Sequence, residues 1–335
     1  MHGRLLVPPK GDIMEYRTLG RSGLKVSAVG LGCNNFGQRC DPAQTKLVVD
    51  AAIDHGITLF DTADIYGGQG KSEEFLGQAL KGKRANVVVT TKFGGPMGQG
   101  EYMSGASRRY MRQAVEASLK RLGTDWIDLY QLHFPDVRTP LEETISTFDD
   151  LVREGKIRYA GCSNFAGWQL VESLWIAKTK NLTPFISAQN YYNMLERNIE
   201  RDLVPAADAN NVGILPYFPL ASGLLTGKYK RGVAPGNDMR LGGDSPFFRG
   251  ALSDANFDKV EKLEKFAAER GKHILDLAFG WLLAQKSVAS VIAGATRPEQ
   301  IEANVKAGEW RLSAEDAKAA GEIVIPPAPG MFGRR

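Results

Sequence analysis

Strand-like segments recur along this chain at a nearly constant interval, and this interval limits the folds that the chain can adopt. The segments begin about 30 to 40 residues apart, except for a longer interval before the last, and helix-like sequence lies between them. Such spacing is typical of repeated strand–helix units, so it predicts an α/β fold, a (β/α)8 TIM barrel. The expected strands begin near Val26, Thr58, Asn86, Ile127, Ile157, Phe185, Gly213 and Ala289.

The residue patterns within the chain agree with buried parallel strands and amphipathic helices. Val87 to Val89 form a continuous apolar run, which suits a parallel strand covered on both faces. Met111, Val115 and Leu119 recur every four residues, as the buried side of a helix does, and Ser107 is available as the N-cap. We therefore expect each strand to be followed by a helix.

The two ends of the chain stand outside this alternation. Residues 16–18 and 24–27 flank the turn Arg21-Ser22-Gly23, which predicts an N-terminal β-hairpin that closes the bottom of the barrel. We expect an N-terminal tail at residues 1–13, a single domain at residues 14–320 and a C-terminal tail at residues 321–335.

Composition and charge argue against several classes of protein. The chain has 335 residues with 43% hydrophobic and 24% charged, and its net charge of +4 includes no basic run with interleaved aromatics, so we expect no nucleic-acid partner. The first apolar run, Leu5 to Val7, is too short for a signal peptide, and no stretch approaches a membrane span. Cys33, Cys40 and Cys162 form no CxxC pair, so we expect a cytoplasmic protein with no disulfide framework and no metal site.

Four ionisable residues lie at or just after the ends of three expected strands. Asp61, Lys92 and His133 each follow an apolar run directly, and Tyr66 comes five residues after Asp61. Each residue alone could be a helix cap or a satisfied core residue. Because catalytic groups of parallel barrels come from the C-terminal ends of several strands, their recurrence predicts one shared site.

The chemistry that suits these four residues is proton delivery by a phenol beside a cation. The ammonium of Lys92 would lower the pKa of Tyr66 from its ordinary value near 10. Asp61 would keep Lys92 charged and oriented, and His133 could hydrogen-bond a carbonyl oxygen that Tyr66 protonates. A reduction of this kind also needs a nicotinamide or flavin, because no side chain donates hydride.

Two other motifs do not support different chemistry. Gly30-Leu31-Gly32 begins like a dinucleotide-binding fingerprint, but Asn35 replaces the third glycine and no helical pattern follows at once. Gly161-Cys162-Ser163-Asn164-Phe165 is not a nucleophile elbow, because its fifth residue is phenylalanine and not glycine.

From Met14 to about Trp310, a set of separated motifs resembles the aldo-keto reductase superfamily. The branch it resembles includes bacterial general reductases and potassium-channel β subunits. The motifs are Phe60–Gly67, Thr91–Gly94, Leu132-His133, Gly155–Arg158, Ser163–Phe165, Gln189–Asn193 and Leu224–Tyr229. The resemblance implies a barrel that binds NADP(H) across the C-terminal ends of the strands. It also implies that Tyr66 is the general acid, that Lys92 and Asp61 tune it, and that His133 orients the substrate.

The resemblance also assigns residues to the nicotinamide half of the cofactor. Ser163, Asn164 and Gln189 would bind the carboxamide. Tyr217 would stack on the ring and so fix which of its faces meets the substrate. By the same resemblance, Pro219, Leu220 and Lys228 would line the pyrophosphate. We also expect Arg240, in the glycine-rich loop of residues 230–249, to contact phosphate.

A later segment resembles the family's adenosine phosphate motif and has a physical interpretation of its own. Thr296 and Glu299 predict a capping box, so a helix N-terminus with free N–H groups would begin here. Arg297 adds a planar cation suited to a phosphate monoester, as NADP(H) carries. The residues expected around the adenosine are Gly294, Thr296, Arg297, Gln300 and Asn304.

Three departures from the family pattern limit what the resemblance implies. Phe218 replaces a serine and removes a hydroxyl from the phosphate environment. Ala303 replaces a glutamate that often contacts the adenine amine. Residues 33–36 replace a Thr-Trp type sequence, so substrate specificity does not carry over.

The sequence thus leaves three functions open. The first is NADPH-dependent reduction of a small-molecule aldehyde or ketone, and the second is a slow-turnover, redox-sensing regulatory subunit. The third is an aldolase with Lys92 as Schiff-base nucleophile, which the sequence permits only if Tyr66 and the cofactor motifs are ignored. For residues 230–249, rich in Gly, Pro, Asp and Arg, we expect a loop that folds over bound cofactor.

Overall fold

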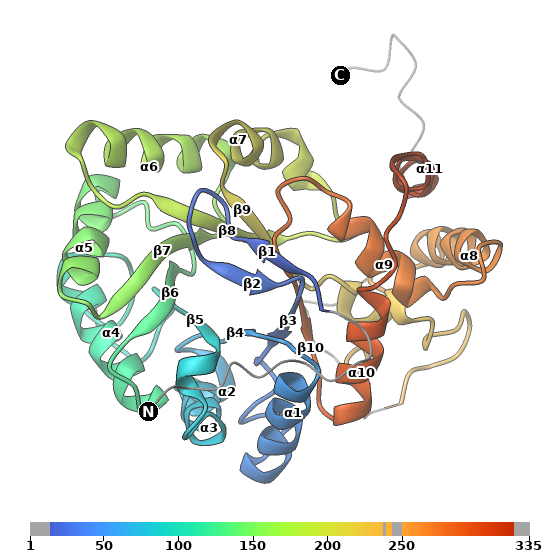
Figure 1. Ribbon diagram of the computed structural model, residues 1–335, viewed down its shortest axis with the longest axis horizontal. Helices are drawn as coiled ribbons and strands as arrows, with labels where there is room; N and C mark the ends of the chain where they lie inside the picture. The colour runs from blue at the N-terminus through green and yellow to red at the C-terminus, as the bar shows by residue number, and fades with distance from the viewer. Residues whose placement is uncertain (1–13, 237–238, 243–249, 325–335) are drawn as a thin grey trace.

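Eight parallel strands form a barrel in the computed structural model, which describes residues 14–236, 239–242 and 250–324 (Figure 1). The strand order is β10-β3-β4-β5-β6-β7-β8-β9. Ile214 of β9 pairs in parallel with Val288, just before β10, and so closes the barrel. The predicted fold is therefore confirmed. The strands are β3 (Val29–Gly32), β4 (Leu59–Asp61), β5 (Val88–Phe93), β6 (Ile127–Leu132), β7 (Ile157–Ser163), β8 (Phe185–Tyr191), β9 (Gly213–Tyr217) and β10 (Val291–Gly294).

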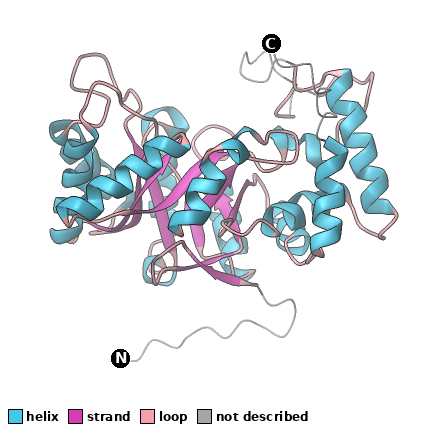
Figure 2. Cartoon of the chain, turned by 90° about the horizontal axis from the view of Figure 1, so that it is seen from above, coloured by secondary structure: helices cyan, strands magenta, loops and turns pink. Residues whose placement is uncertain are grey.

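Helices surround the strands (Figure 1), and Figure 2 shows them on both sides of the strands. The longer ones are α1 (Pro42–Asp54), α3 (Lys71–Ala79), α4 (Arg108–Leu122), α5 (Leu141–Arg153), α6 (Gly167–Lys180), α7 (Leu203–Asn210), α8 (Asp254–Ala268), α9 (Ile274–Leu283), α10 (Pro298–Ala307) and α11 (Ala314–Val324). Short turns are α2 (Tyr66–Gln69), η1 (Arg84–Asn86), η2 (Asn198–Arg201) and η3 (Ala221–Thr226). Within the described ranges, no helix is long and apolar enough to cross a membrane.

Helix α4 begins where the sequence predicts. The Ser107 side chain accepts a hydrogen bond from the Tyr110 N–H and satisfies one of the free donors of the first turn. Met111, Val115 and Leu119 are all buried. Gly123 ends the helix in the left-handed conformation that glycine adopts without strain.

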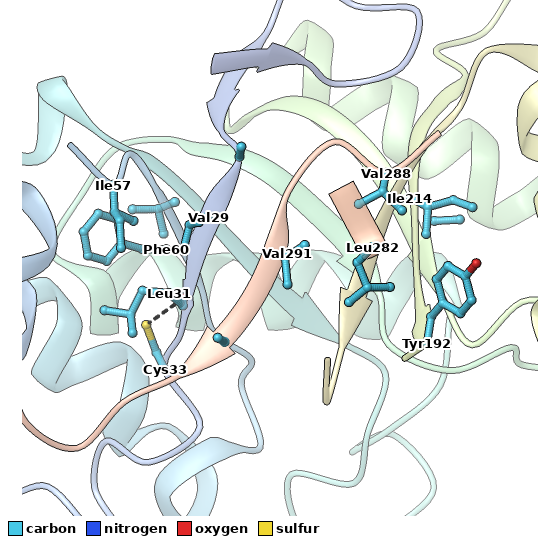
Figure 3. Close-up of a cluster of buried hydrophobic side chains, with 14 of the residues drawn as sticks. Val29, Leu31, Cys33, Ile57, Phe60, Tyr192, Ile214, Leu282, Val288 and Val291 are labelled. Carbon is cyan, nitrogen blue, oxygen red and sulfur yellow. Dashed lines mark hydrogen bonds between the residues drawn. The ribbon is translucent and has the colours of Figure 1, made fainter. Parts of the chain in front are cut away.

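The barrel core consists of two clusters because neighbouring residues on a strand point in opposite directions. Leu59 and Ile292 belong to a cluster inside the barrel, whereas Phe60 and Val291 belong to the layer that includes residues from the surrounding helices. Figure 3 shows Val29, Leu31 and Val291 on the adjacent strands β3 and β10. Both faces of these strands are covered, which explains their continuous apolar sequence.

The hairpin β1 (Tyr16–Thr18) and β2 (Lys25–Ser27) lies across the N-terminal end of the barrel (Figure 1). Leu19 and Val26 are buried in the inner cluster. Gly20 has φ +56°, and a Cβ there would lie 2.4 Å from the Ile186 carbonyl oxygen, so only glycine fits. Arg17 donates hydrogen bonds to the carbonyl oxygens of Leu283 and Val288 at 2.8 and 2.9 Å. The opposite end of the barrel is left for ligands.

Several boundaries differ from the prediction. The first barrel strand begins at Val29 and not near Val26, because Val26 belongs to the hairpin, where packing against the barrel interior also favours an apolar residue. Helix α11 continues past residue 320, where we placed the end of the domain, to Val324, which is buried. Residues 1–13, and parts of the 230–249 loop and the C-terminal tail, lie outside the described residues, so the loop's closure over cofactor stays a prediction.

Candidate active site

A cavity of about 470 Å³ opens at the C-terminal ends of the strands. The loops after most of the strands contribute to its walls, together with the start of α10. All the predicted site residues line it except Lys92 and Arg297. Those that line it are Asp61, Tyr66, His133, Ser163, Asn164, Gln189, Tyr217, Pro219, Leu220, Lys228, Arg240, Gly294, Thr296, Gln300 and Asn304.

Asp61 and Lys92 form an ion pair because of the register between β4 and β5. Asp61 pairs with Thr90, and Lys92 lies two residues further along β5, on the same side of the sheet. Lys92 Nζ donates to Asp61 Oδ2 at 2.8 Å and to the Thr62 carbonyl oxygen at 2.7 Å. Gln189 Nε2 donates to the other carboxylate oxygen, Asp61 Oδ1, at 2.8 Å. The pair is thus fixed from three strands and lies beneath the cavity.

Tyr66 lies directly against this pair. The Lys92 ammonium hydrogen-bonds the Tyr66 side chain and lies 5.0 Å from the centre of its ring. Gly67 follows with φ +71°, and a Cβ there would lie 2.6 Å from the Phe36 carbonyl oxygen. Glycine at this position therefore lets the turn that carries Tyr66 pack against the loop after β3.

Burial has a larger effect on the acidity of Tyr66 than the neighbouring cation has. Burial raises the pKa of Tyr66, Lys92 lowers it, and the net shift is upward. The prediction that Lys92 would bring this pKa below its ordinary value is wrong, because desolvation disfavours the phenolate by more than Lys92 favours it. Burial lowers the pKa of Lys92, but Asp61 and then Tyr66 raise it by more, so its net shift is upward.

His133 is held as a neutral imidazole. Burial, and secondarily the charge of Lys92, hold its pKa well below the usual value. Its ring stacks on Phe134 with centroids 4.3 Å apart and meets the Tyr66 ring edge-on at 5.7 Å. His133 Nδ1 is buried and has no hydrogen-bond partner among the described residues. His133 and Tyr66 therefore face one region of the cavity.

An acidic residue, Asp64, lies two positions before Tyr66 and is also buried. Burial, followed by the charge of Glu73, raises the pKa of Asp64 to about 8. Glu73 itself accepts hydrogen bonds from Thr91 Oγ1 at 2.5 Å and from Arg121 Nε at 2.6 Å. Asp64 is therefore mostly a neutral acid at pH 7.

Amide and hydroxyl groups gather at the cavity wall formed by β7, β8 and β9. The Tyr217 hydroxyl donates to Asn164 Oδ1 at 2.8 Å. Asn164 Nδ2 donates to the His133 carbonyl oxygen at 3.0 Å and to Ser163 Oγ at 3.2 Å. The Tyr217 ring stacks on Tyr191, with centroids 5.6 Å apart. These groups could bind a planar amide beside the catalytic residues.

Positively charged residues line another part of the cavity. Lys228 follows η3, where Gly223 has φ +97° and a Cβ would lie 2.9 Å from Lys228 Cε. Arg240 donates from Nη2 to Asn35 Oδ1 at 3.0 Å. Arg39 and Asn35, which the sequence reasoning did not select, also line the cavity. The expectation that catalytic groups lie at the C-terminal ends of barrel strands could have identified this loop, because the loop directly follows β3, the first barrel strand.

The start of α10 differs from the predicted capping box. The N-cap is Arg297 and not Thr296, and its side chain makes no capping hydrogen bond. Pro298 takes the first helical position, where its fixed φ is favourable, and so shifts the start by one residue. Gln300 Oε1, not Glu299, accepts from the Thr296 N–H at 2.7 Å. Arg297 is exposed beside the cavity and does not line it.

The cysteines show no sign of a disulfide or metal site. Cys33, Cys40 and Cys162 are free and buried. Within the part of the chain that the structure describes, no group of three or more His, Cys, Asp or Glu residues could hold a metal ion. Gly30 and Gly32 lie within β3 and do not form a turn before a helix, so they are not a dinucleotide fingerprint.

Residues 28–325 match the sequence profile of the Aldo/keto reductase family. The chain belongs to this family. It is 37% identical to an uncharacterized oxidoreductase, YrpG, of Bacillus subtilis, over 95% of this chain and 97% of that protein. It is 36% identical to a probable voltage-gated potassium channel subunit beta of Arabidopsis thaliana (88% and 91%) and 35% identical to L-glyceraldehyde 3-phosphate reductase of Escherichia coli K12 (90% and 89%). An aldo-keto reductase is an oxidoreductase that reduces carbonyl compounds with a nicotinamide cofactor.

Proposed function

We propose that this aldo-keto reductase uses NADPH to reduce a small aldehyde or ketone, with Tyr66 as the proton donor. The observation that supports this most is the contact of Tyr66 with the buried Lys92–Asp61 pair, beside a neutral His133, at the floor of the cavity. Tyr66 is protonated at neutral pH and so holds a proton to give, although its raised pKa makes it a weaker acid than an ordinary phenol.

Each of the four residues has a distinct role in this proposal. Tyr66 gives its proton to the carbonyl oxygen of the substrate, and Lys92 stabilises the phenolate that remains. Asp61 keeps Lys92 protonated and fixes its position. His133, neutral in this site, orients the carbonyl oxygen by a hydrogen bond without competing as an acid.

The polar groups along the cavity wall suit the successive parts of a nicotinamide dinucleotide. Ser163, Asn164 and Gln189 suit the carboxamide, and the Tyr217 ring supplies a flat face for the nicotinamide. When bound, the reduced nicotinamide supplies hydride. Lys228 and Arg240 suit the pyrophosphate. The remaining cofactor contacts would come from Pro219, Leu220, Gly294, Thr296, Arg297, Gln300 and Asn304.

Lys92 is poorly placed for the aldolase alternative. Its amine is fully buried, does not line the cavity and has a raised pKa, whereas a Schiff-base nucleophile must be accessible and neutral. The regulatory alternative draws support from the similarity to the Arabidopsis potassium channel subunit. Steady-state turnover of simple aldehydes separates it from the proposed enzyme, because a regulatory subunit would turn over slowly.

The decisive experiment is the replacement Tyr66→Phe. This variant should lower kcat by about 100-fold or more, the usual scale of general acid catalysis, because phenylalanine has no proton to give. NADPH affinity, measured by fluorescence titration, should change little. A variant that keeps most of its turnover would remove Tyr66 from the proposed mechanism.

A further inference from the structure

Two residues that line the cavity, Asn35 and Phe218, contact the same arginine. Asn35 lies in the loop after β3, and Phe218 lies directly after β9, so the two are far apart in sequence. Arg240 donates from Nη2 to Asn35 Oδ1 at 3.0 Å, and its Cζ lies 5.5 Å from the centre of the Phe218 ring. Asn35 and Phe218 thus hold one guanidinium, the first by a hydrogen bond and the second by its aromatic ring.

We propose that Asn35 and Phe218 are positioning residues that hold Arg240 in the cavity for the phosphate groups of the nucleotide cofactor. This inference rests on the proposed function, because it assumes that the cavity binds NADPH.

Asn35 can serve as a fixed support because its own position is well defined. The residue is only 4% exposed, and its Nδ2 donates to the Ala295 carbonyl oxygen at 3.3 Å. Its backbone oxygen accepts hydrogen bonds from the N–H groups of Arg39 and Cys40 at 2.8 and 3.0 Å. The side-chain oxygen is thereby left to face Arg240, and the same amide joins Arg240 to the segment that precedes α10.

Phe218 is equally well fixed. Its ring meets the rings of Tyr191 and Tyr217 edge-on, with centroids 5.8 and 5.4 Å away. Its carbonyl oxygen accepts a hydrogen bond from Asn193 Nδ2 at 2.9 Å. Because Tyr217 belongs to the part of the cavity assigned to nicotinamide, Phe218 connects that part to the cationic part.

Arg240 itself is suited to bind an anion. Burial, and then the charge of Arg39, lower its pKa, but a guanidinium stays protonated in proteins. A partly desolvated cation near other cations gains more from an incoming phosphate than a solvated one does. An arginine that is already held also loses less side-chain entropy on binding, which corresponds to an affinity about 2- to 12-fold higher.

A double-mutant cycle tests this inference. NADPH dissociation constants are measured by isothermal titration calorimetry for the wild type, Asn35→Leu, Arg240→Ala and the double variant. We expect Asn35→Leu to weaken binding about 2- to 12-fold and Arg240→Ala to weaken it more. The double variant should bind no worse than Arg240→Ala, since Asn35 acts through Arg240. Equal losses from Asn35→Leu in both backgrounds would overturn the inference.

Phe218 provides a second test that does not depend on the folding of the Asn35 variant. Phe218→Tyr keeps the aromatic face and should bind NADPH as the wild type does, whereas Phe218→Leu should lose affinity to a similar extent as Asn35→Leu. Gln38→Ala, an exposed change in the same loop as Asn35, is the matched control. If Phe218→Leu binds NADPH as tightly as the wild type does, the inference about Asn35 and Phe218 is contradicted and the proposed function still stands. If the wild-type protein does not bind NADPH, the proposed function itself is contradicted.

Discussion

Replacement of Asp61 by asparagine should destabilise the whole fold and not only impair catalysis. The Lys92 side chain is 0% exposed, and Asp61 is the carboxylate that compensates its charge. Asparagine keeps the size of the side chain and one acceptor oxygen but removes the negative charge. The buried ammonium would then keep its bond to the Thr62 carbonyl oxygen without a counter-ion.

The expected loss of unfolding free energy in Asp61→Asn follows from the cost of an uncompensated buried charge. Breaking a buried ion pair by removing one partner costs about 3 to 5 kcal/mol, and we expect the lower part of this range because polar contacts to Lys92 remain. Total unfolding free energies are about 5 to 15 kcal/mol, so the change should be large. Equilibrium urea unfolding of the cofactor-free protein, followed by tryptophan fluorescence, measures it.

The control is the double variant Asp61→Leu/Lys92→Met, which removes both charges and keeps similar volumes. It should recover most of the stability while remaining inactive, because a buried pair is often no more stable than apolar residues in its place. Two results would refute this reasoning: an Asp61→Asn protein within about 1 kcal/mol of the wild type, or a double variant as unstable as the single one.

Three further predictions concern the cofactor and the response to pH. Arg297→Ala should weaken NADPH binding roughly 10-fold and leave NADH binding nearly unchanged. The loss lies near the lower end of the range for a charge-assisted contact because Arg297 is exposed. Equal losses of affinity for both cofactors in titrations would contradict the assignment of Arg297 to the phosphate monoester of NADPH. His133 has a depressed pKa in the folded state, so unfolding takes up a proton below about pH 6.5 and stability falls as the pH drops. In urea unfolding at pH 5 and 7, His133→Gln should lessen this fall. If the unfolding free energy of the variant fell with pH as steeply as that of the wild type, His133 would be excluded as the source of the fall. Asp64 has a pKa raised to about 8, so its contribution to stability is greatest below the unfolded pKa and is lost as the pH rises towards 8. Asp64→Asn should therefore be more stable than the wild type at pH 7.5. A less stable variant would show that contacts of the carboxyl group stabilise the fold, in addition to the carboxyl being neutral.

Local sequence patterns predicted the elements whose signals are themselves local. The cap at Ser107 and the apolar spacing of α4 needed nothing from the rest of the chain. The polar ends of β4, β5 and β6 marked Asp61, Lys92 and His133 because parallel strands bring their ends together. Motif resemblance then added residues such as Tyr217.

Other features depend on contacts that a local pattern does not contain. Val26 has the same apolar character whether it packs in a hairpin or in a barrel strand. The pKa of Tyr66 depends on how completely the folded chain excludes water, and the sequence carries only the nearby charges. The hydrogen bond from Arg240 to Asn35 joins residues 205 positions apart, so neither residue alone reveals it.

The hydrogen bonds of Arg17 have a consequence for the synthesis of this protein. Arg17 is among the first described residues to leave the ribosome, yet its acceptors lie 266 and 271 residues later in the chain. These bonds cannot form until residues 283 and 288 have emerged, and the inner cluster that buries Leu19 and Val26 also lacks Ala289 and Ile292 until then. Contacts of such large sequence separation slow folding and leave time for aggregation. We therefore expect the nascent chain to need protection by chaperones until its last strand is made.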